Sequence, residues 1–352
     1  MKVRSLCRAV VSVALLHAAG AWADETPWKT LGTLPGVAVQ DLSFVTGDVG
    51  FAAGGNGQIW RTTNGARDWS VVLEIDDGHY WYGVQALNAR DIVVSGFIDT
   101  ADVQTAVIRW SHDGGDAWSD DLVLSTADWA KRVHFWDGDV GFAMSGFLEP
   151  NGEFRTSNGG LFATDWSAVT IDPNGGWFGA QFSALPNGHV RVSGITYCES
   201  LDYAATWQCR PSIDEVSDDA TYFVDDLHGW VGGGGGIADE NGGHFEGWLH
   251  VTTDGGATWS ERTLDDGWPI NQILFVNAHD GWAMGGGGDF GGAYASHDGG
   301  QTWNVEFDSG TGFTACATAD YHIYCAAYDD ANTTHFYTRD YDHILVDEFG
   351  QD

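Results

Sequence analysis

Aromatic and acidic side chains occur together in several short segments of this 352-residue chain. Tryptophan and tyrosine rings stack on sugars or hold the side chains of a peptide, and carboxylates accept hydrogen bonds from hydroxyl or amide groups. Two carboxyl groups about 5 to 10 Å apart would also meet the requirement of a glycoside hydrolase. The candidate ligand-binding residues are Tyr80, Trp81, Trp129, Trp177, Trp268, Glu153, Asp239, Glu246 and Asp289.

A repeated turn separates these segments along the chain. Its clearest copies read Ser/Thr-x-Asp-Gly-Gly-x-x-Trp, at residues 111–118, 252–259 and 296–303, and weaker copies end at Trp69, Trp166 and Trp207. A seventh, eroded copy surrounds Asp340. The copies return roughly every 46 residues with strand-like sequence between them, which is typical of a β-propeller with one blade per repeat.

The acidic or amide residue of each turn has a structural role. Its side-chain oxygen can accept backbone N–H groups two or three residues further on, and the glycines adopt positive φ without a steric penalty. The tryptophan can bury its ring between neighbouring blades. We therefore interpret these residues as turn-closing rather than catalytic: Asn64, Asp113, Asn158, Asp202, Asp254 and Asp298.

A hairpin pattern precedes each turn. Residues 44–54 recur at 135–146, 223–232 and 275–285, with divergent copies at 86–96, 182–194 and 313–326. Alternating apolar residues around an Asp/Gly turn predict two short antiparallel strands. The sequence thus predicts an all-β domain over residues 24–352, a seven-bladed β-propeller of four-stranded antiparallel blades. We expect residues 28–31 to complete the last blade, with residues 343–349 as the alternative outer strand.

The hairpin followed by the segment GQIWRTTNG, at residues 57–65, resembles the photosystem II stability/assembly-factor-like propellers. More broadly, the repeats resemble BNR/Asp-box proteins, which include sialidases and other glycoside hydrolases. The resemblance spans about residues 28–345 and implies the fold, since a shared propeller does not fix an activity. Sialidases also need a Phe/Tyr-Arg-Ile/Leu-Pro motif, whereas Phe154 and Arg155 are followed here by Thr156 and Ser157. Sialidase activity is not expected.

The N-terminal 23 residues predict a cleavable signal peptide. They have a basic start, an apolar run and an Ala-Trp-Ala ending. No later segment approaches the roughly 18 apolar residues of a membrane span. We expect a periplasmic or extracellular protein without membrane insertion.

The chain is strongly acidic. Its formal charge is −35 at pH 7, and it becomes −38 once residues 1–23, with three basic residues and no acidic one, are removed. Because phosphate binding depends on clustered Lys and Arg, a nucleic-acid partner is excluded as a function class. A solvated acidic surface explains this charge, and attraction of cations or of a basic partner is the alternative.

Four cysteines follow the signal peptide, and local pairing of Cys198 with Cys209 and of Cys316 with Cys325 is geometrically natural. The alternative is two pairs of buried thiols. Neither spacing is Cys-x-x-Cys, and no paired-histidine motif occurs. We expect no metal and no cofactor.

The blade pattern predicts which face binds a ligand. If the repeated turn joins the third and fourth strands, the between-blade loops and the loops joining strands two and three emerge on the opposite face. This places the candidate residues listed above on one face around the channel. We interpret the chain as an exported, non-enzymatic binding or assembly module for a glycan or a polypeptide, with no catalytic residues. The alternative is a glycoside hydrolase of neutral glycans, and the rings could equally be plugs between blades.

Overall fold

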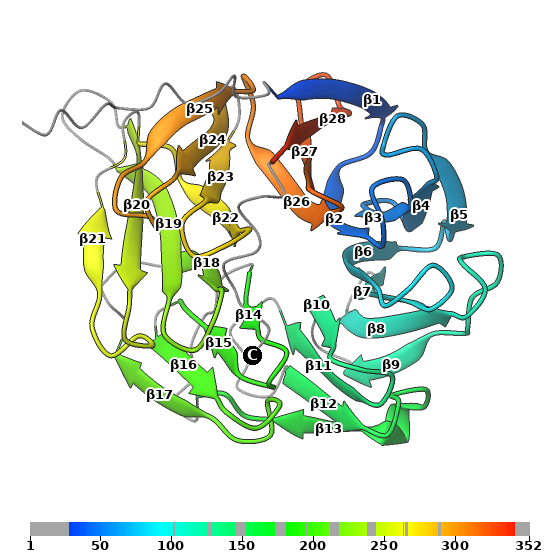
Figure 1. The fold of residues 1–352 in the computed structure, drawn as a ribbon. Helices are drawn as coiled ribbons and strands as arrows, with labels where there is room; N and C mark the ends of the chain where they lie inside the picture. Colours follow the sequence, from blue (N-terminus) through cyan, green and yellow to red (C-terminus); the bar gives the residue numbers. More distant parts are fainter. Residues whose placement is uncertain are drawn as a thin grey trace, which may run out of the picture.

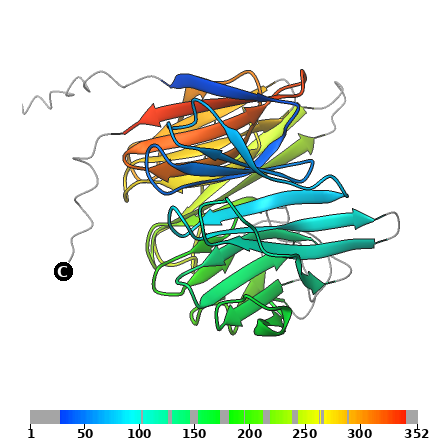
Figure 2. The ribbon, with the colours of Figure 1, turned by 90° about the vertical axis from the view of Figure 1, so that its right-hand side faces the viewer.

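The computed structural model describes residues 28–100, 103–125, 129–145, 153–172, 181–194, 196–211, 218–237, 244–262, 264, 267–287 and 290–341. They form seven four-stranded antiparallel sheets arranged as blades around a central axis (Figure 1). Figure 2 shows the ring from the side. The predicted fold class is confirmed.

The strands follow the order of the repeats, with the first strand of each blade nearest the axis. Blades one to three contain β2 (Val39–Phe44), β3 (Gly50–Gly54), β4 (Gln58–Thr62) and β5 (Ser70–Glu74); β6 (His79–Ala86), β7 (Ile92–Thr100), β8 (Val103–Ser111) and β9 (Leu122–Ser125); and β10 (Ala130–Phe135), β11 (Val140–Ser145), β12 (Glu153–Ser157) and β13 (Trp166–Val169). Blade three also has a 3-10 turn, η1 (Ala163–Asp165).

Blades four to seven have the same strand order. They contain β14 (Ser183–Ala184), β15 (Val190–Val192), β16 (Thr196–Ser200) and β17 (Gln208–Pro211); β18 (Asp218–Phe223), β19 (Gly229–Ile237), β20 (His244–Thr252) and β21 (Ser260–Arg262); β22 (Ile270–Phe275), β23 (Gly281–Gly287), β24 (Phe290–Ser296) and β25 (Asn304–Asp308); and β26 (Phe313–Ala319), β27 (His322–Tyr328), β28 (Thr333–Asp340) and β1 (Lys29–Pro35).

The antiparallel order gives the ring two different faces. The connections from first to second and from third to fourth strands lie on one face, which we call the turn face. The connections from second to third strands and between blades lie on the other, which we call the loop face. The repeated turns therefore join third and fourth strands, as the sequence predicts.

Side-chain hydrogen bonds close the repeated turns. In blade two, the Ser111 hydroxyl donates to Asp113 Oδ1 at 2.9 Å, and Asp113 Oδ1 accepts the Ala117 backbone N–H at 2.8 Å. Asn64, Asp202, Asp254 and Asp298 accept the equivalent N–H in their own blades. The longer turn of blade three differs, because there the Asn158 side-chain amide donates to Asp165.

The ring closes through its N-terminal strand. β1 pairs antiparallel with β28, in a register that runs from Lys29 opposite Thr338 to Pro35 opposite Thr333. The Trp28 ring stacks on Phe307 and Phe313, with ring centres 5.4 and 5.7 Å apart. The expected pairing of residues 28–31 with the last blade is confirmed. The alternative strand at 343–349 lies outside the described residues, as does the predicted signal peptide.

A buried carboxylate supports this closure from blade six. Glu306 Oε1 accepts hydrogen bonds from Arg339 Nε and Nη2 at 3.0 and 2.8 Å, while Glu306 Oε2 accepts the indole N–H groups of Trp28 and Trp282 at 2.7 and 2.9 Å. The Arg339 and Glu306 side chains are 7% and 12% exposed. Four donor groups, from two strands and from the residue before β1, thus share one carboxylate.

Both predicted disulfides are confirmed. Cys198 is bonded to Cys209 between β16 and β17, and Cys316 to Cys325 between β26 and β27. Each joins directly opposed residues of neighbouring strands. In the described part of the chain, no helix is long and apolar enough to cross a membrane.

Replacement of Glu306 by Ala should destabilise the ring strongly. It leaves the buried Arg339 guanidinium and two indole N–H groups without their acceptor, so we expect the free energy of unfolding to fall by about 3 to 5 kcal/mol. The matched control is Lys29→Ala, which removes an ion pair to Asp340 whose side chains are 50% and 30% exposed. That variant should lose less than about 1 kcal/mol. Urea unfolding measures both, and equal losses would contradict a special role for Glu306.

Candidate functional site

Two of the predicted residues come together on the loop face. Tyr80 and Tyr82 alternate on β6, so both rings point to the same side of the blade. Phe97 of β7 stacks on Tyr80 and on Trp129, with ring centres 5.0 Å apart in both pairs, and Tyr82 stacks on Trp129 at 5.8 Å. We call Tyr80, Tyr82, Phe97 and Trp129 the aromatic cluster.

The aromatic cluster combines apolar faces with polar edges. Phe97 is buried, while the other three rings are partly exposed. The Trp129 indole N–H donates to the Gln104 side chain. Burial, followed by the neighbouring Tyr80, raises the pKa of Tyr82, so its hydroxyl remains a hydrogen-bond donor at neutral pH. A surface of this kind suits a ligand with apolar groups beside hydrogen-bonding ones.

Two other predicted tryptophans belong to the core. Trp81 is 0% exposed and packs with Phe51 and Ile59, and Trp268 is 8% exposed and packs against Tyr294. Because side chains alternate along β6, Trp81 points away from its neighbours Tyr80 and Tyr82. Neither ring presents an open face to solvent, so both fill the space between blades.

The predicted carboxylates are dispersed. Glu153 begins β12 in blade three and is 6% exposed, whereas Glu246 lies in β20 of blade five and is exposed. Blade four separates them. The remaining candidates, Trp177, Asp239 and Asp289, lie outside the described residues.

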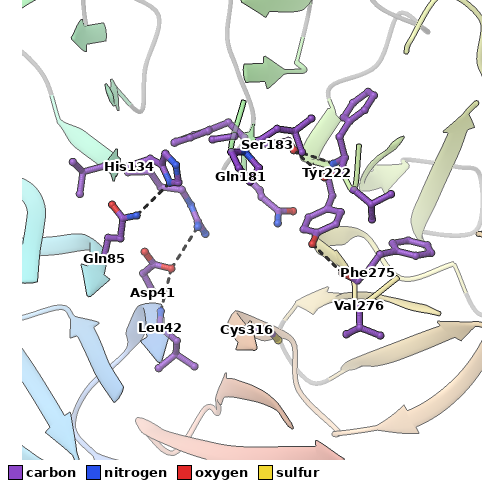
Figure 3. Close-up of a pocket in the computed structure, with 18 of the residues that line it drawn as sticks. Asp41, Leu42, Gln85, His134, Gln181, Ser183, Tyr222, Phe275, Val276 and Cys316 are labelled. Carbon is purple, nitrogen blue, oxygen red and sulfur yellow. Dashed lines mark hydrogen bonds and ion pairs between the residues drawn. The ribbon is translucent and has the colours of Figure 1, made fainter. Parts of the chain in front are cut away.

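A central channel of about 490 Å³ runs along the inner strands (Figure 3). It reaches the first turns of blades four to six, on the turn face. Its lining combines apolar and polar residues, and few of them are charged. The polar lining residues are Asp41, Gln85, Arg132, His134, Gln181, Ser183, Tyr222 and Asn277.

Several inner-strand side chains bond to the open backbone edges of neighbouring inner strands. An unpaired strand edge leaves N–H and C=O groups that need partners. The Gln85 side-chain amide donates to Phe135 O at 3.0 Å, and its oxygen accepts Phe135 N–H at 2.6 Å. Gln272 makes the same pair of bonds to Cys316 in the next blade. Each glutamine thus connects two neighbouring blades as a short piece of strand would.

Two further side chains connect blades that are not neighbours. Gln181 of blade four bonds to both backbone groups of Ile273 in blade six, at 2.8 and 2.9 Å. Arg132 of blade three lies with Nη1 3.4 Å from Asp41 Oδ1 in blade one. These contacts link inner strands that lie two blades apart around the channel.

Burial shifts the pKa values of Asp41 and His134 in the channel towards their neutral forms. Burial raises the pKa of Asp41, although Arg132 and the N–H groups of Val84 and Leu42 oppose this effect. Burial lowers the pKa of His134 to about 4, so the imidazole is neutral at pH 7. Among the described lining residues, Asp41 is the only carboxylate.

Sequence reasoning missed the channel residues because each blade contributes only one or two of them. A signal was nevertheless present. Aligning the hairpins places several of these residues at the same repeat position, just before the Phe or Ala that ends the first strand. The residues at that position are Ser43, Gln85, His134, Ser183 and Tyr222.

Solved propellers share this fold. The structure of YCF48 bound to D1 peptide is 16% identical, with a TM-score of 0.64, and the match covers 91% of this chain and 98% of that one. YCF48 from Cyanidioschyzon merolae is 17% identical at 0.64, covering 90% and 99%. The WD40 β-propeller domain of Doa1 is 11% identical at 0.61, covering 89% and 97%.

At these identities the similarity establishes the fold alone. No protein-family model matches the chain, and no curated protein matches its sequence. The two YCF48 structures support the propeller that the repeats imply, while membership of the BNR/Asp-box group stays a prediction.

Replacement of His134 by Gln should reduce the amount by which the free energy of unfolding falls as the pH is lowered. The folded pKa of about 4 lies below the unfolded value of 6.5, so the unfolded chain takes up a proton first as the pH falls. The stabilising contribution is present above pH 6.5 and is lost between pH 6.5 and 4, by about 3 kcal/mol. Urea unfolding of both proteins at pH 7.5 and pH 4.5 measures the difference. An identical pH dependence would show that His134 titrates normally in the folded ring.

Proposed function

We propose that the protein is an exported, non-enzymatic binding module whose ligand is a polypeptide, and that the aromatic cluster is its main contact. The observation behind the proposal is the stack of Tyr80, Phe97, Trp129 and Tyr82 across the boundary between blades two and three. Large, rigid rings with polar edges are effective anchors for peptide side chains, because they bury much surface with little loss of conformational freedom.

A related fold supports the choice of a polypeptide. One of the structurally similar propellers is YCF48 bound to a D1 peptide, so this architecture is able to hold a peptide. The mature charge of −38 favours neutral or basic segments and opposes anionic sugars or nucleic acids. A neutral glycan is the competing ligand, since it would stack on the same rings.

The channel chemistry favours binding over glycoside hydrolysis. Hydrolysis needs two carboxyl groups facing each other across the substrate. Asp41 is the only carboxylate among the described channel-lining residues, and it accepts the backbone N–H groups of Val84 and Leu42 at 3.0 Å. Its bonds hold neighbouring inner strands together, which is a structural use of the group.

Peptide and glycan arrays on the mature protein identify the ligand, and two tryptophan variants locate it. We expect a polypeptide ligand and a loss of about 1 to 3 kcal/mol of binding free energy on replacement of Trp129 by Ala, with little change in melting temperature. The matched control is Trp81→Ala, which lies between Tyr80 and Tyr82 along β6 but is fully buried. It should lower stability by about 3 to 5 kcal/mol.

Three results would count against the proposal. The first is binding of glycans without peptides, and the second is release of sugar from a bound glycan. The third is a Trp129→Ala protein that unfolds like Trp81→Ala while its residual folded fraction binds the ligand normally, since the ring would then be a blade plug.

A further inference from the structure

Exposed apolar side chains gather on the turn face of blades three to five. Four described residues there are more than half exposed: Leu161 at 51%, Phe162 at 67%, Leu201 at 57% and Leu227 at 54%. Elsewhere among the described large hydrophobic residues, only Phe245 exceeds half, and its ring lies against Phe290. We call Leu161, Phe162, Leu201 and Leu227, with Tyr203 between them, the apolar strip.

Contacts between neighbouring turns connect the segments that carry the apolar strip. The Arg155 guanidinium of blade three donates to Tyr203 O in blade four at 2.7 Å, and the Trp136 ring meets the Tyr203 ring edge-on at 5.3 Å. The Asn187 side chain of blade four donates to Asp226 in blade five at 3.1 Å, directly before Leu227. Within blade three, the Gly159 N–H of the repeated turn donates to Asp139 O of the first turn at 2.9 Å. The turns that carry the strip are therefore linked from blade three to blade five through the first turns of blades three and four.

Two of these positions carry no large apolar side chain in the other repeats. The residue between the hydroxyl and the acid of the repeated turn is Leu201 in blade four. Its equivalents are Thr63, His112, Ser157, Thr253 and His297. Leu227 is the fourth residue of its hairpin turn, where the other blades have Asp48, Arg90, Asp139, Gly188 and His279. The fold does not need apolar side chains there, because other blades form the same turns without them.

Carboxylates surround the apolar strip. Asp137 and Asp139 are exposed in the first turn of blade three, Asp202 lies between Leu201 and Tyr203, and Asp226 is exposed beside Leu227. The backbone N–H groups of Val140 and Asp139 lower the pKa of Asp137, so this carboxylate is ionised at neutral pH. The nearby cations are already engaged: Arg155 bonds to Tyr203 O, while Arg191 and His189 bond to Asp226.

We propose that the apolar strip is a second interaction surface, and that its partner is a polypeptide segment in which apolar side chains alternate with lysine or arginine. Apolar contact supplies the burial, and the surrounding carboxylates complement the basic side chains. A second copy of this chain is disfavoured, since pairing two strips would bring two sets of carboxylates together. This surface lies on the face opposite the aromatic cluster, so the protein is able to hold two polypeptides at once.

A pair of synthetic peptides tests the proposal. One is a 12-residue labelled peptide of alternating Leu or Phe and Lys, and the other has Glu in place of Lys. Fluorescence anisotropy with the mature protein should show binding of the Lys peptide alone, weakened by added salt. The double variant F162S/L201S should bind it at least tenfold more weakly, whereas V71S/V305S, which changes two exposed valines on the outer strands β5 and β25, should bind it as the parent does.

Charge removal provides a second readout. The variant D137N/D139N should weaken binding of the Lys peptide and reduce its salt dependence, with the melting temperature of each variant reported alongside. Trp129→Ala should leave this binding unchanged, which separates the apolar strip from the aromatic cluster. Equal weakening by F162S/L201S and V71S/V305S, equal binding of the Glu peptide, or no binding of the Lys peptide would overturn the proposal. So would a dimer in sedimentation velocity that F162S/L201S abolishes, because the occupant would then be a second copy.

Discussion

The pairing of β1 with β28 is the interaction on which the rest of the structure depends. A single blade is a small twisted sheet that buries its faces only against its two neighbours, so an open ring would expose the sides of its terminal blades to water. The N-terminal strand completes the seventh blade and joins the two ends of the chain. Glu306 secures this junction by accepting hydrogen bonds from Trp28, Trp282 and Arg339.

Closure of the ring also leaves backbone groups of the inner strands without partners in a sheet. Seven inner strands meet around one axis, and each leaves one backbone edge unpaired. The side-chain amides of Gln85, Gln272 and Gln181 bond to these unpaired edges, because an amide group donates and accepts hydrogen bonds at once. The channel is consequently a structural element with few ionised groups. The ligand contacts that we propose therefore lie outside the channel, at the two ends of the blades.

Much of the fold could be predicted because it repeats. The number of blades follows from the count of repeats. The turn hydrogen bonds of Asp113 and Asp254 and both disulfides depend on residues that are close together in sequence, so a local pattern is enough to predict them. The N-terminal strand was predictable for the same reason, since its sequence resembles the strand that follows each turn.

The candidate site was less predictable, because single residues decide it. Tyr80 and Trp81 are adjacent in sequence, yet one lies in the aromatic cluster and the other in the core. The direction of a strand side chain depends on register, and a bulge after Trp81 shifts the register of β6 against β7. The apolar strip could not be predicted, because Leu161, Leu201 and Leu227 are far apart in sequence and share one face only when three blades stand side by side.

A crystal structure of the mature protein with its bound ligand tests the central claim most directly. Our account predicts a polypeptide whose side chains contact Tyr80, Tyr82 and Trp129 on the loop face, with the contacts between Gln85 and Phe135 unchanged in the channel. A sugar held between two carboxylates, or a ligand that enters the channel and displaces Gln181 from Ile273, would contradict it.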